Sequence, residues 1–185
     1  MNDAKLYHAN NFSTKERCIG DGSVTAHLLK KYIPDNFEKL LGCDINENMV
    51  KFANDHHKSD KIMFSVLDIE GNLPENMKRK FDNAFSFYTL HWIMKQETAF
   101  KNIFDLMSAG GDCLLMFLCY NPVFDAFRAL AHNNKWSSWF QGLGGFISPY
   151  HDSQEPEEVR SLMTKVGFSN IVVKWQQKNT TVPRL

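Results

Sequence analysis

The stretch from Leu40 to Met49, LLGCDINENM, constrains the fold more than any other part of the chain. Its apolar run ends at Asp44, and Asn46 then begins a helical pattern with Glu47 in the first turn. This pattern predicts a buried strand, a carboxylate at its carboxyl end and a capped helix. Ligands of open α/β sheets bind beyond the carboxyl ends of the strands, where an acid can accept hydrogen bonds from both hydroxyls of a ribose. The alternative interpretation is that Asp44 is an ordinary helix-start residue.

A small-residue turn, GDGS, lies at Gly20 to Ser23, about 22 residues before that acid, which is the spacing of a nucleoside-binding α/β unit. The strand expected before this turn is unusual, because Lys15, Glu16 and Arg17 are three consecutive charges. Charged side chains without partners do not fit the centre of a parallel sheet. Residues 14–19 are therefore predicted to form only a stub of the first strand.

Short apolar runs alternate with amphipathic helices along the rest of the chain, which is typical of a doubly wound α/β sheet. Strands are predicted at 39–43, 62–67, 81–88, 113–118 and 170–175, and helices at 24–32, 49–57, 98–107 and 155–166. The run CLLMFL at 113–118 indicates a strand buried on both faces. The strand at 62–67 again ends at an acid, Asp68, which favours a repeated architecture.

The length of 185 residues fits one domain, 1–185. It divides into an N-terminal arm and stub strand (1–19), a nucleoside-binding core (20–118), an aromatic helical insertion (119–154) and a final helix and strand (155–185). Lys plus Arg and Asp plus Glu both number 21, so no charge field favours nucleic acid or an anionic membrane. The four cysteines show no metal-ligand or disulfide spacing, and no apolar run is long enough for a membrane span. No metal site is predicted, and a cytoplasmic protein is expected.

Seven blocks of sequence together carry a resemblance to a known family. They read GDGSVT, GCDINENMVKFAN, FSVLDIEG, FDNAFSFYTLHWI, FKNIFDLMSAGGDCLLMF, FISPYHDSQEPE and VGFSNI. The chain, over roughly residues 20 to 175, resembles the insect juvenile hormone acid O-methyltransferases. That resemblance implies a Rossmann-like class I methyltransferase sheet with helices on both faces, S-adenosylmethionine as cofactor, and methylation of the carboxylate of juvenile hormone acid or farnesoic acid.

The resemblance also implies roles for particular residues. Gly20, Asp21 and Gly22 would be the remaining part of the cofactor loop, and Asp44 the ribose acid. Ile45 would flank the adenine, while Asp68 and Ile69 would contact its amino edge and its face. His91 and Trp92 would lie near the methyl-transfer centre and the substrate carboxylate, as the catalytic residues. The alternative for this last pair is a strand end packed under a helix.

The chain departs from the family at several places. Cys18 replaces the first glycine of the loop, where a side chain crowds a tight backbone. Thr14 replaces a glutamine of the family, and the first and last strands are expected to be truncated or missing. A sheet that lacks a central strand leaves backbone unpaired, so marginal stability or a homodimer is expected. A catalytically silent isoform or paralogue, acting as a weak cofactor or lipid binder or a partner subunit, is the alternative function. An NAD-dependent oxidoreductase is disfavoured by Thr25 in the third position of the turn.

Methyl transfer to a carboxylate needs no strong base, because the carboxylate is already ionised at neutral pH, so catalysis would rest on proximity and orientation. His91 or the indole N–H of Trp92 could donate to a carboxylate oxygen. The aromatic insertion predicts either a pocket wall for an apolar isoprenoid acid or plain core packing. His151 and Asp152 are interpreted as a hydrogen-bonded pair within a loop.

Overall fold

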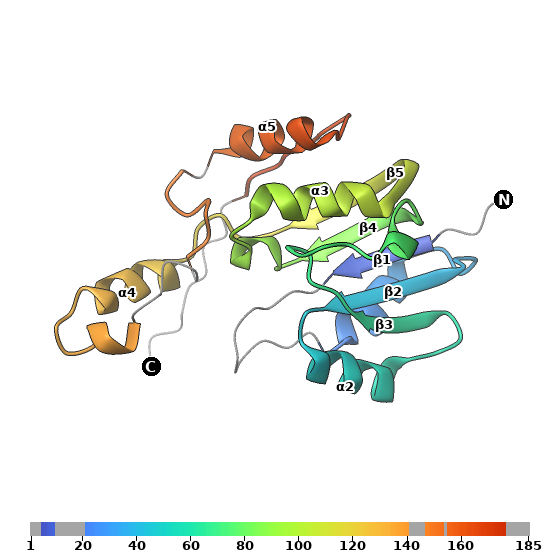
Figure 1. Ribbon diagram of the computed structural model, residues 1–185, viewed down its shortest axis with the longest axis horizontal. Coiled ribbons are helices and arrows are strands. Elements are labelled where there is room, and N and C mark those ends of the chain that lie inside the picture. The colour runs from blue at the N-terminus through green and yellow to red at the C-terminus, as the bar shows by residue number, and fades with distance from the viewer. Residues whose placement is uncertain (1–4, 10–20, 141–146, 154, 177–185) are drawn as a thin grey trace.

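Five parallel strands form one sheet in the order β3-β2-β1-β4-β5 (Figure 1). The structure is a computed structural model that describes residues 5–9, 21–140, 147–153 and 155–176. The strands are β1 (Lys5–Ala9), β2 (Lys39–Asp44), β3 (Ile62–Val66), β4 (Phe81–Phe87) and β5 (Met107–Met116). The predicted parallel α/β sheet is therefore confirmed.

Helices cover both faces of this sheet, as Figure 1 shows. The longer helices are α2 (Glu47–His57), α3 (Gln96–Leu106), α4 (Pro122–Ala131) and α5 (Pro156–Val166). Shorter helical segments are η1 (Val24–Leu29), α1 (Lys30–Tyr32), η2 (Glu75–Met77), η3 (Leu90–Trp92) and η4 (Ser137–Phe140). Neighbouring strand residues point to opposite faces, and on β2 Leu40 joins one apolar cluster while Leu41 packs against another. The larger cluster contains the inner side chains of α3, and the smaller one contains Leu29 of η1.

The central strand comes from a part of the chain that was predicted to be an arm. Lys5–Ala9 pairs with β2 on one side, where Leu6 lies opposite Leu40, and with β4 on the other, where Tyr7 lies opposite Ala84. The stub expected at 14–19 lies outside the described residues. Assigning Lys5–Ala9 to an arm was therefore wrong: this five-residue segment pairs its backbone with two neighbouring strands. Because Lys5–Ala9 fills the central slot, no unpaired strand edge there requires a second copy of the chain.

The fifth strand differs from its prediction in length and in burial. It begins at Met107, directly after α3, so Gly110 and Gly111 lie within the strand and not at a helix end. Its pairing with β4 is irregular between Phe81 and Asn83, and Gly110 has a φ of +80° there. Leu114 and Met116 are 56% and 43% exposed. The prediction of burial on both faces was wrong, because only the face with Cys113 and Leu115 packs against an apolar cluster, while the face with Leu114 and Met116 is exposed.

The sixth predicted strand, at 170–175, is not a strand in the structure. This segment is attached instead to α5, where an Arg160 guanidinium N–H donates to the carbonyl oxygen of Ile171 at 2.5 Å. No pairing with β5 is formed by these described residues, and Val172 is 76% exposed.

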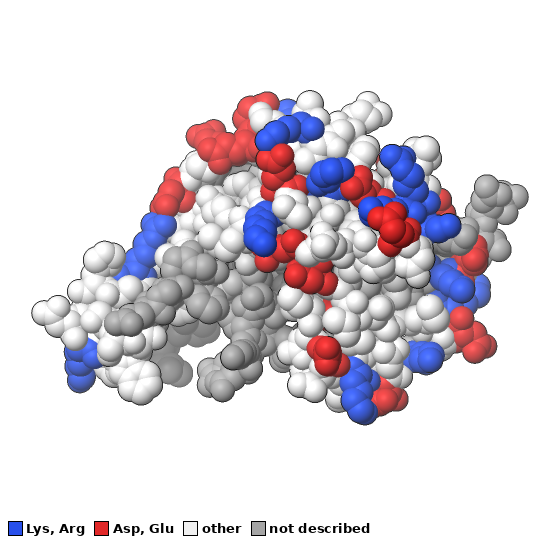
Figure 2. Space-filling model, viewed as in Figure 1, with Lys and Arg blue, Asp and Glu red and all other residues white. Residues whose placement is uncertain are grey.

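Acidic and basic side chains are interspersed over the face shown in Figure 2, with no large field of one sign. This distribution agrees with the balanced charge of the sequence. In the part of the chain that the structure describes, no helix has both the length and the apolar character needed to cross a membrane.

Candidate functional site

Asp44 ends β2 and is the most constrained polar side chain of the candidate site. It is only 5% exposed, and its Oδ1 accepts the backbone N–H of Asn46 at 2.8 Å. Its Oδ2 is buried and has no hydrogen-bond partner among the described residues. Burial raises the pKa of Asp44 to about 6, even though the backbone N–H groups of Asn46 and Ile45 favour the charged form. A buried carboxylate oxygen without a partner fits a ligand hydroxyl, as expected for the ribose of a nucleoside cofactor.

The turn after Asp44 is held by the first residues of α2. Asn46 is the N-cap of this helix, and its side-chain oxygen accepts the backbone N–H groups of Asn48 at 2.9 Å and Met49 at 3.3 Å. The predicted strand, acid and capped helix are therefore confirmed. Since the cap fixes Asn46, it also fixes the N–H group that orients the Asp44 carboxylate.

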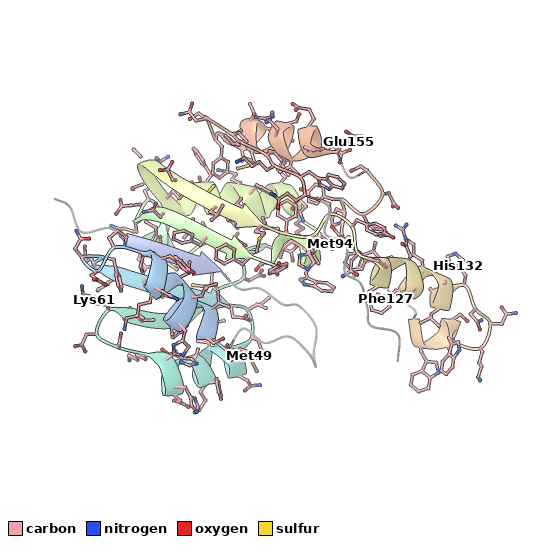
Figure 3. The ribbon with its side chains drawn as sticks, turned by 180° about the vertical axis from the view of Figure 1, so that it is seen from behind. Met49, Lys61, Met94, Phe127, His132 and Glu155 are labelled. Atoms are coloured by element: carbon pink, nitrogen blue, oxygen red, sulfur yellow. The ribbon has the colours of Figure 1, made fainter. Side chains whose placement is uncertain are left out.

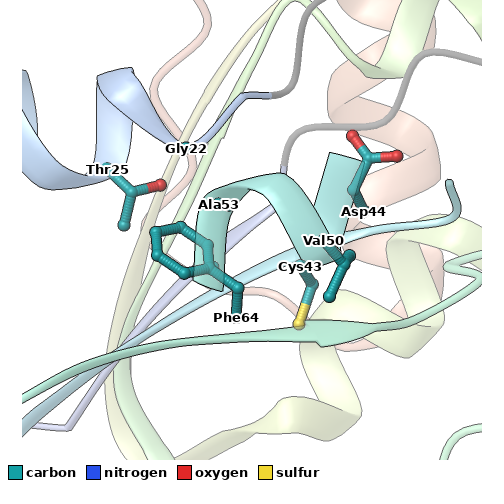
Figure 4. A pocket seen from close by; sticks show the side chains of 8 residues that line it. Gly22, Thr25, Cys43, Asp44, Val50, Ala53 and Phe64 are labelled. Carbon is teal, nitrogen blue, oxygen red and sulfur yellow. The ribbon is translucent and has the colours of Figure 1, made fainter. Parts of the chain in front are cut away.

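A small pocket lies beside this acid, and Figure 4 shows the Asp44 carboxylate at one end of it. The residues that line the pocket are Gly22, Thr25, Gly42, Cys43, Asp44, Val50, Ala53 and Phe64. Gly22 has a φ of +85°, and a Cβ placed there would lie 2.8 Å from the Cβ of Ala53 and 2.9 Å from the Phe64 ring. The glycine is therefore required both by its backbone conformation and by close packing.

The glycine turn is described only in part. The Oδ1 of Asp21 accepts the N–H of Ser23 at 2.8 Å, which closes the turn that leads into η1. Gly20 lies outside the described residues, as do Cys18 and Thr14. Asp21 and Gly22 thus precede a helix as predicted, and Gly22 shares the pocket with Asp44.

The residues predicted to surround the adenine lie on two neighbouring strand ends. β2 and β3 pair so that Asp44 lies opposite Val66, two residues before Asp68. Ile45 is 37% exposed beside Asp44, as an adenine contact requires. Asp68 is exposed, and its Oδ1 accepts the N–H of Glu70 at 2.8 Å.

Ile69 differs from the other predicted adenine contacts. Its side chain is 2% exposed and packs in the larger apolar cluster, while its carbonyl oxygen accepts a hydrogen bond from Asn102 of α3 at 2.8 Å. The structure therefore does not support the predicted contact between the Ile69 side chain and the adenine face. The alternation of apolar residues after β3 turns Ile69 toward α3.

His91 and Trp92 lie on η3, directly after β4. His91 is 2% exposed, and its Nδ1 is 3.5 Å from the backbone N of Leu118. Burial lowers its pKa to about 4, so the imidazole is neutral at physiological pH. With Nδ1 as acceptor, the proton is assigned to Nε2, which makes Nε2–H a hydrogen-bond donor. Trp92 packs against His91 with 4.8 Å between the ring centroids.

Several residues of this region were not predicted or were paired differently. The Oγ of Ser86, near the end of β4, is buried without a hydrogen-bond partner among the described residues. The signal in the sequence is a single serine between Phe85 and Phe87 at the end of the strand. His151 pairs with Asp125 and not with Asp152, because its Nε2 is 2.8 Å from an Asp125 oxygen, whereas Asp152 accepts two hydrogen bonds from Arg128. The proposed loop pair was therefore wrong.

Comparison with known proteins gives a consistent result. Residues 18–115 match the family described as a methyltransferase domain. A juvenile hormone acid O-methyltransferase from Bombyx mori is 53% identical over 199 residues, covering 94% of this chain and 71% of that protein. One from Drosophila melanogaster is 41% identical over 153 residues, covering 80% of this chain and 51% of that protein. An S-adenosylmethionine-dependent methyltransferase structure from Mesorhizobium loti has a TM-score of 0.58 at 15% identity, covering 90% of this chain and 74% of that chain, and shares the fold.

The fold, the domain match and the strand-end acid define a class I methyltransferase, the class that uses S-adenosylmethionine. The chain belongs to the juvenile hormone acid O-methyltransferase family. It spans 71% of the length of the Bombyx relative and about half of the Drosophila one, at 51%.

Proposed function

We propose that this protein transfers a methyl group from S-adenosylmethionine to the carboxylate of an apolar isoprenoid acid, such as juvenile hormone acid or farnesoic acid. The observation that carries the proposal is the buried Asp44 carboxylate beside the Gly22 turn. The names of the Bombyx and Drosophila relatives support the substrate class.

The cofactor would be held mainly by strand ends. The free Oδ2 of Asp44 would accept a ribose hydroxyl, and exposed Ile45 and Asp68 would border the adenine. When bound, S-adenosylmethionine supplies an electrophilic methyl group on sulfur. Asp44 would hold the nucleoside, and the close packing around Gly22 would keep the turn in place.

The substrate acid would be oriented by η3. At neutral pH the acid is a carboxylate, so no residue has to remove a proton from it. His91 is neutral and would donate its Nε2–H to one carboxylate oxygen, and Trp92 is the second candidate donor. These residues would align the acid with the methyl group, which is the main source of rate acceleration for such a reaction.

The test is a transfer assay with methyl-labelled S-adenosylmethionine and either acid, followed by extraction of the ester. We expect labelled ester from the native chain, and at least about a tenfold loss with Asp44→Asn, because its amide replaces a charged acceptor for the ribose. Calorimetric titration with S-adenosylhomocysteine is run in parallel. Cofactor binding without transfer to either acid would contradict the proposed reaction and favour a catalytically silent relative.

A further inference from the structure

Helix α4 stands beyond the carboxyl ends of the strands and extends away from the sheet (Figure 1). In Figure 3, Phe127 and His132, the residue that follows the helix, lie on its outward side, and Met94, two residues after η3, lies where the helix joins the rest of the molecule. The position of such a helix depends on the side chains near its first turns. One of them, Phe124, contacts Trp92 of η3, which also carries His91.

Two side chains one turn apart attach α4 to the segment at 148–152. Asp125 Oδ1 accepts the Nε2–H of His151 at 2.8 Å, and the Arg128 guanidinium donates one hydrogen bond to each Asp152 oxygen at 2.6 Å. The first contact is the more enclosed, since His151 is 3% exposed, whereas the Asp152 side chain is 73% exposed.

The Asp125 carboxylate is engaged at both oxygens. The hydroxyl of Tyr120 donates to Oδ2 at 2.9 Å, and the Tyr120 ring stacks on the His151 ring at 5.0 Å with an angle of 7° between the planes. These hydrogen bonds hold the pKa of Asp125 below its ordinary value. Each of Tyr120, Asp125 and His151 therefore contacts the other two, and this cluster is called here the α4 clamp.

The α4 clamp is joined to Trp92 through Phe124. Phe124 is 1% exposed, and its ring meets the His151 ring edge-on at 5.3 Å and the Trp92 ring edge-on at 5.8 Å. A shift of His151 or α4 therefore moves the aromatic surface against which Trp92 rests. Close-packed aromatic contacts transmit such shifts because little free volume can absorb them.

The segment at 148–152 is also linked to His91 and to both ends of η3, through hydrogen bonds to Leu118 and Gln96. The Ser148 hydroxyl donates to the carbonyl oxygen of Leu118 at 3.3 Å, and the N–H of Leu118 faces His91 Nδ1. The Tyr150 hydroxyl donates to Gln96 Oε1 at 3.1 Å. Gln96 in turn donates to the carbonyl oxygens of Leu90 and Ile93, which flank His91 and Trp92.

We propose that His151 and Asp125 are positioning residues for the substrate acid. By fixing Phe124 and α4 against Trp92, they set the orientation of the His91 and Trp92 pair toward the carboxylate. This inference rests on the proposed function, in which η3 holds the acid. It assigns no contact between the α4 clamp and the cofactor, so acid binding and cofactor binding are expected to respond differently.

The experiment measures the affinity for farnesoic acid by calorimetry at saturating S-adenosylhomocysteine, and separately the affinity for S-adenosylhomocysteine. The variants are His151→Ala, Asp125→Ala and Asp125→Asn, which keeps an acceptor for His151. Lys165→Ala is the matched control, since it removes an exposed ion pair with Glu97 that joins α3 and α5. Methyl transfer by each protein gives KM for the acid and for S-adenosylmethionine.

We expect His151→Ala and Asp125→Ala to weaken acid binding by about tenfold or more, because a misplaced binding group loses much of its effect. Their affinity for S-adenosylhomocysteine should stay within about twofold of the native value, since no clamp residue lines the small pocket beside Asp44. Asp125→Asn should recover most of the acid affinity, and Lys165→Ala should behave as the native protein. In the transfer assay, KM for the acid should rise and KM for S-adenosylmethionine should not.

Native acid affinity in a folded His151→Ala protein would overturn the inference. So would an equal loss of acid and cofactor affinity, which indicates a general structural role, or no acid binding by the native chain. If the native chain binds the acid in a clamp-dependent manner but transfers no methyl group, the proposed reaction fails and the positioning role stands.

Discussion

At the residue scale, burial of the Asp44 carboxylate affects cofactor affinity and the stability of the chain without cofactor in opposite ways. With a pKa of about 6, the group is ionised at pH 7 although most of it is removed from water. One carboxylate oxygen accepts the backbone N–H of Asn46, and the other has no hydrogen-bond partner among the described residues. The folded chain without cofactor therefore carries an electrostatic cost that a ribose hydroxyl would reduce.

Cofactor affinity should depend on pH through this group. A ribose hydroxyl that donates to Asp44 favours the ionised form, so affinity falls as pH drops through the pKa of about 6. Between about pH 7 and pH 5 the affinity for S-adenosylhomocysteine should fall by about tenfold, since about one tenth of the carboxyl groups is ionised one unit below the pKa. Calorimetric titration at several pH values measures this. Asp44→Asn should show no such inflection, and a flat profile for the native chain would contradict the role.

The same carboxyl group should have the opposite effect on the stability of the chain without cofactor, which should rise as the pH falls. A folded-state pKa above the unfolded one contributes stability that is present below about pH 4 and is lost as pH rises through about 6. At pH 7 the ionised Asp44 therefore destabilises the fold, and Asp44→Asn should raise the free energy of unfolding by about 1–2 kcal/mol. Urea unfolding at pH 7 and pH 4 tests this. A gain of the same size at both pH values would point to a cause other than charge.

At the scale of single elements, the cap of α2 joins stability to the site. Asn46 caps the helix through its side chain and orients Asp44 through its backbone N–H. The helix and its capping residue were predictable from local sequence, because an N-cap acts over three or four residues. The exposure of one face of β5 was not predictable, since the sequence CLLMFL is the same whether or not another layer covers that face.

Asn46→Ala should lower the free energy of unfolding by about 1 kcal/mol, because two N–H groups of the first turn lose their acceptor. It should also weaken binding of S-adenosylhomocysteine, as the turn that presents Asp44 loosens. Asn46→Ser, which keeps a side-chain acceptor, is the matched control and should stay near the native values. Chemical unfolding and calorimetry provide both readouts; equal behaviour of the two variants would show that the cap has no such role.

For the whole molecule, β1 is decisive because it lies between β2 and β4 in the described sheet. Its five residues supply backbone pairs to both neighbours, so losing the strand would divide the sheet in two. The central place of Lys5–Ala9 also makes the N-terminal segment part of the fold that supports the site at the ends of β2 and β4.

His8→Pro should therefore cost about 3 kcal/mol or more, since proline removes an N–H from the ladder and does not fit a central strand. His8→Val, which keeps the N–H and suits a strand, is the control and should melt cooperatively near the native temperature. Thermal melts followed by circular dichroism measure both. A cooperative melt of His8→Pro at the native temperature would show that this segment does not hold the sheet together.

The sequence by itself determined the features that depend on neighbouring residues: the strand, acid and capped helix around Asp44, the glycine turn before η1, and the alternation of strands with helices. Each results from backbone preferences and apolar periodicity over a few residues. The seven family blocks added His91 and Trp92, which no local pattern distinguishes from a packed strand end.

Only the tertiary structure decided which segment occupies the central slot, which way Ile69 faces and which acid pairs with His151. Lys5–Ala9 is short and partly polar, so its place depends on the unpaired backbone of β2 and β4. Ile69 is turned inward by α3, and His151 meets Asp125 from 26 residues away. Such contacts depend on how distant elements pack, and sequence spacing carries no information about that distance.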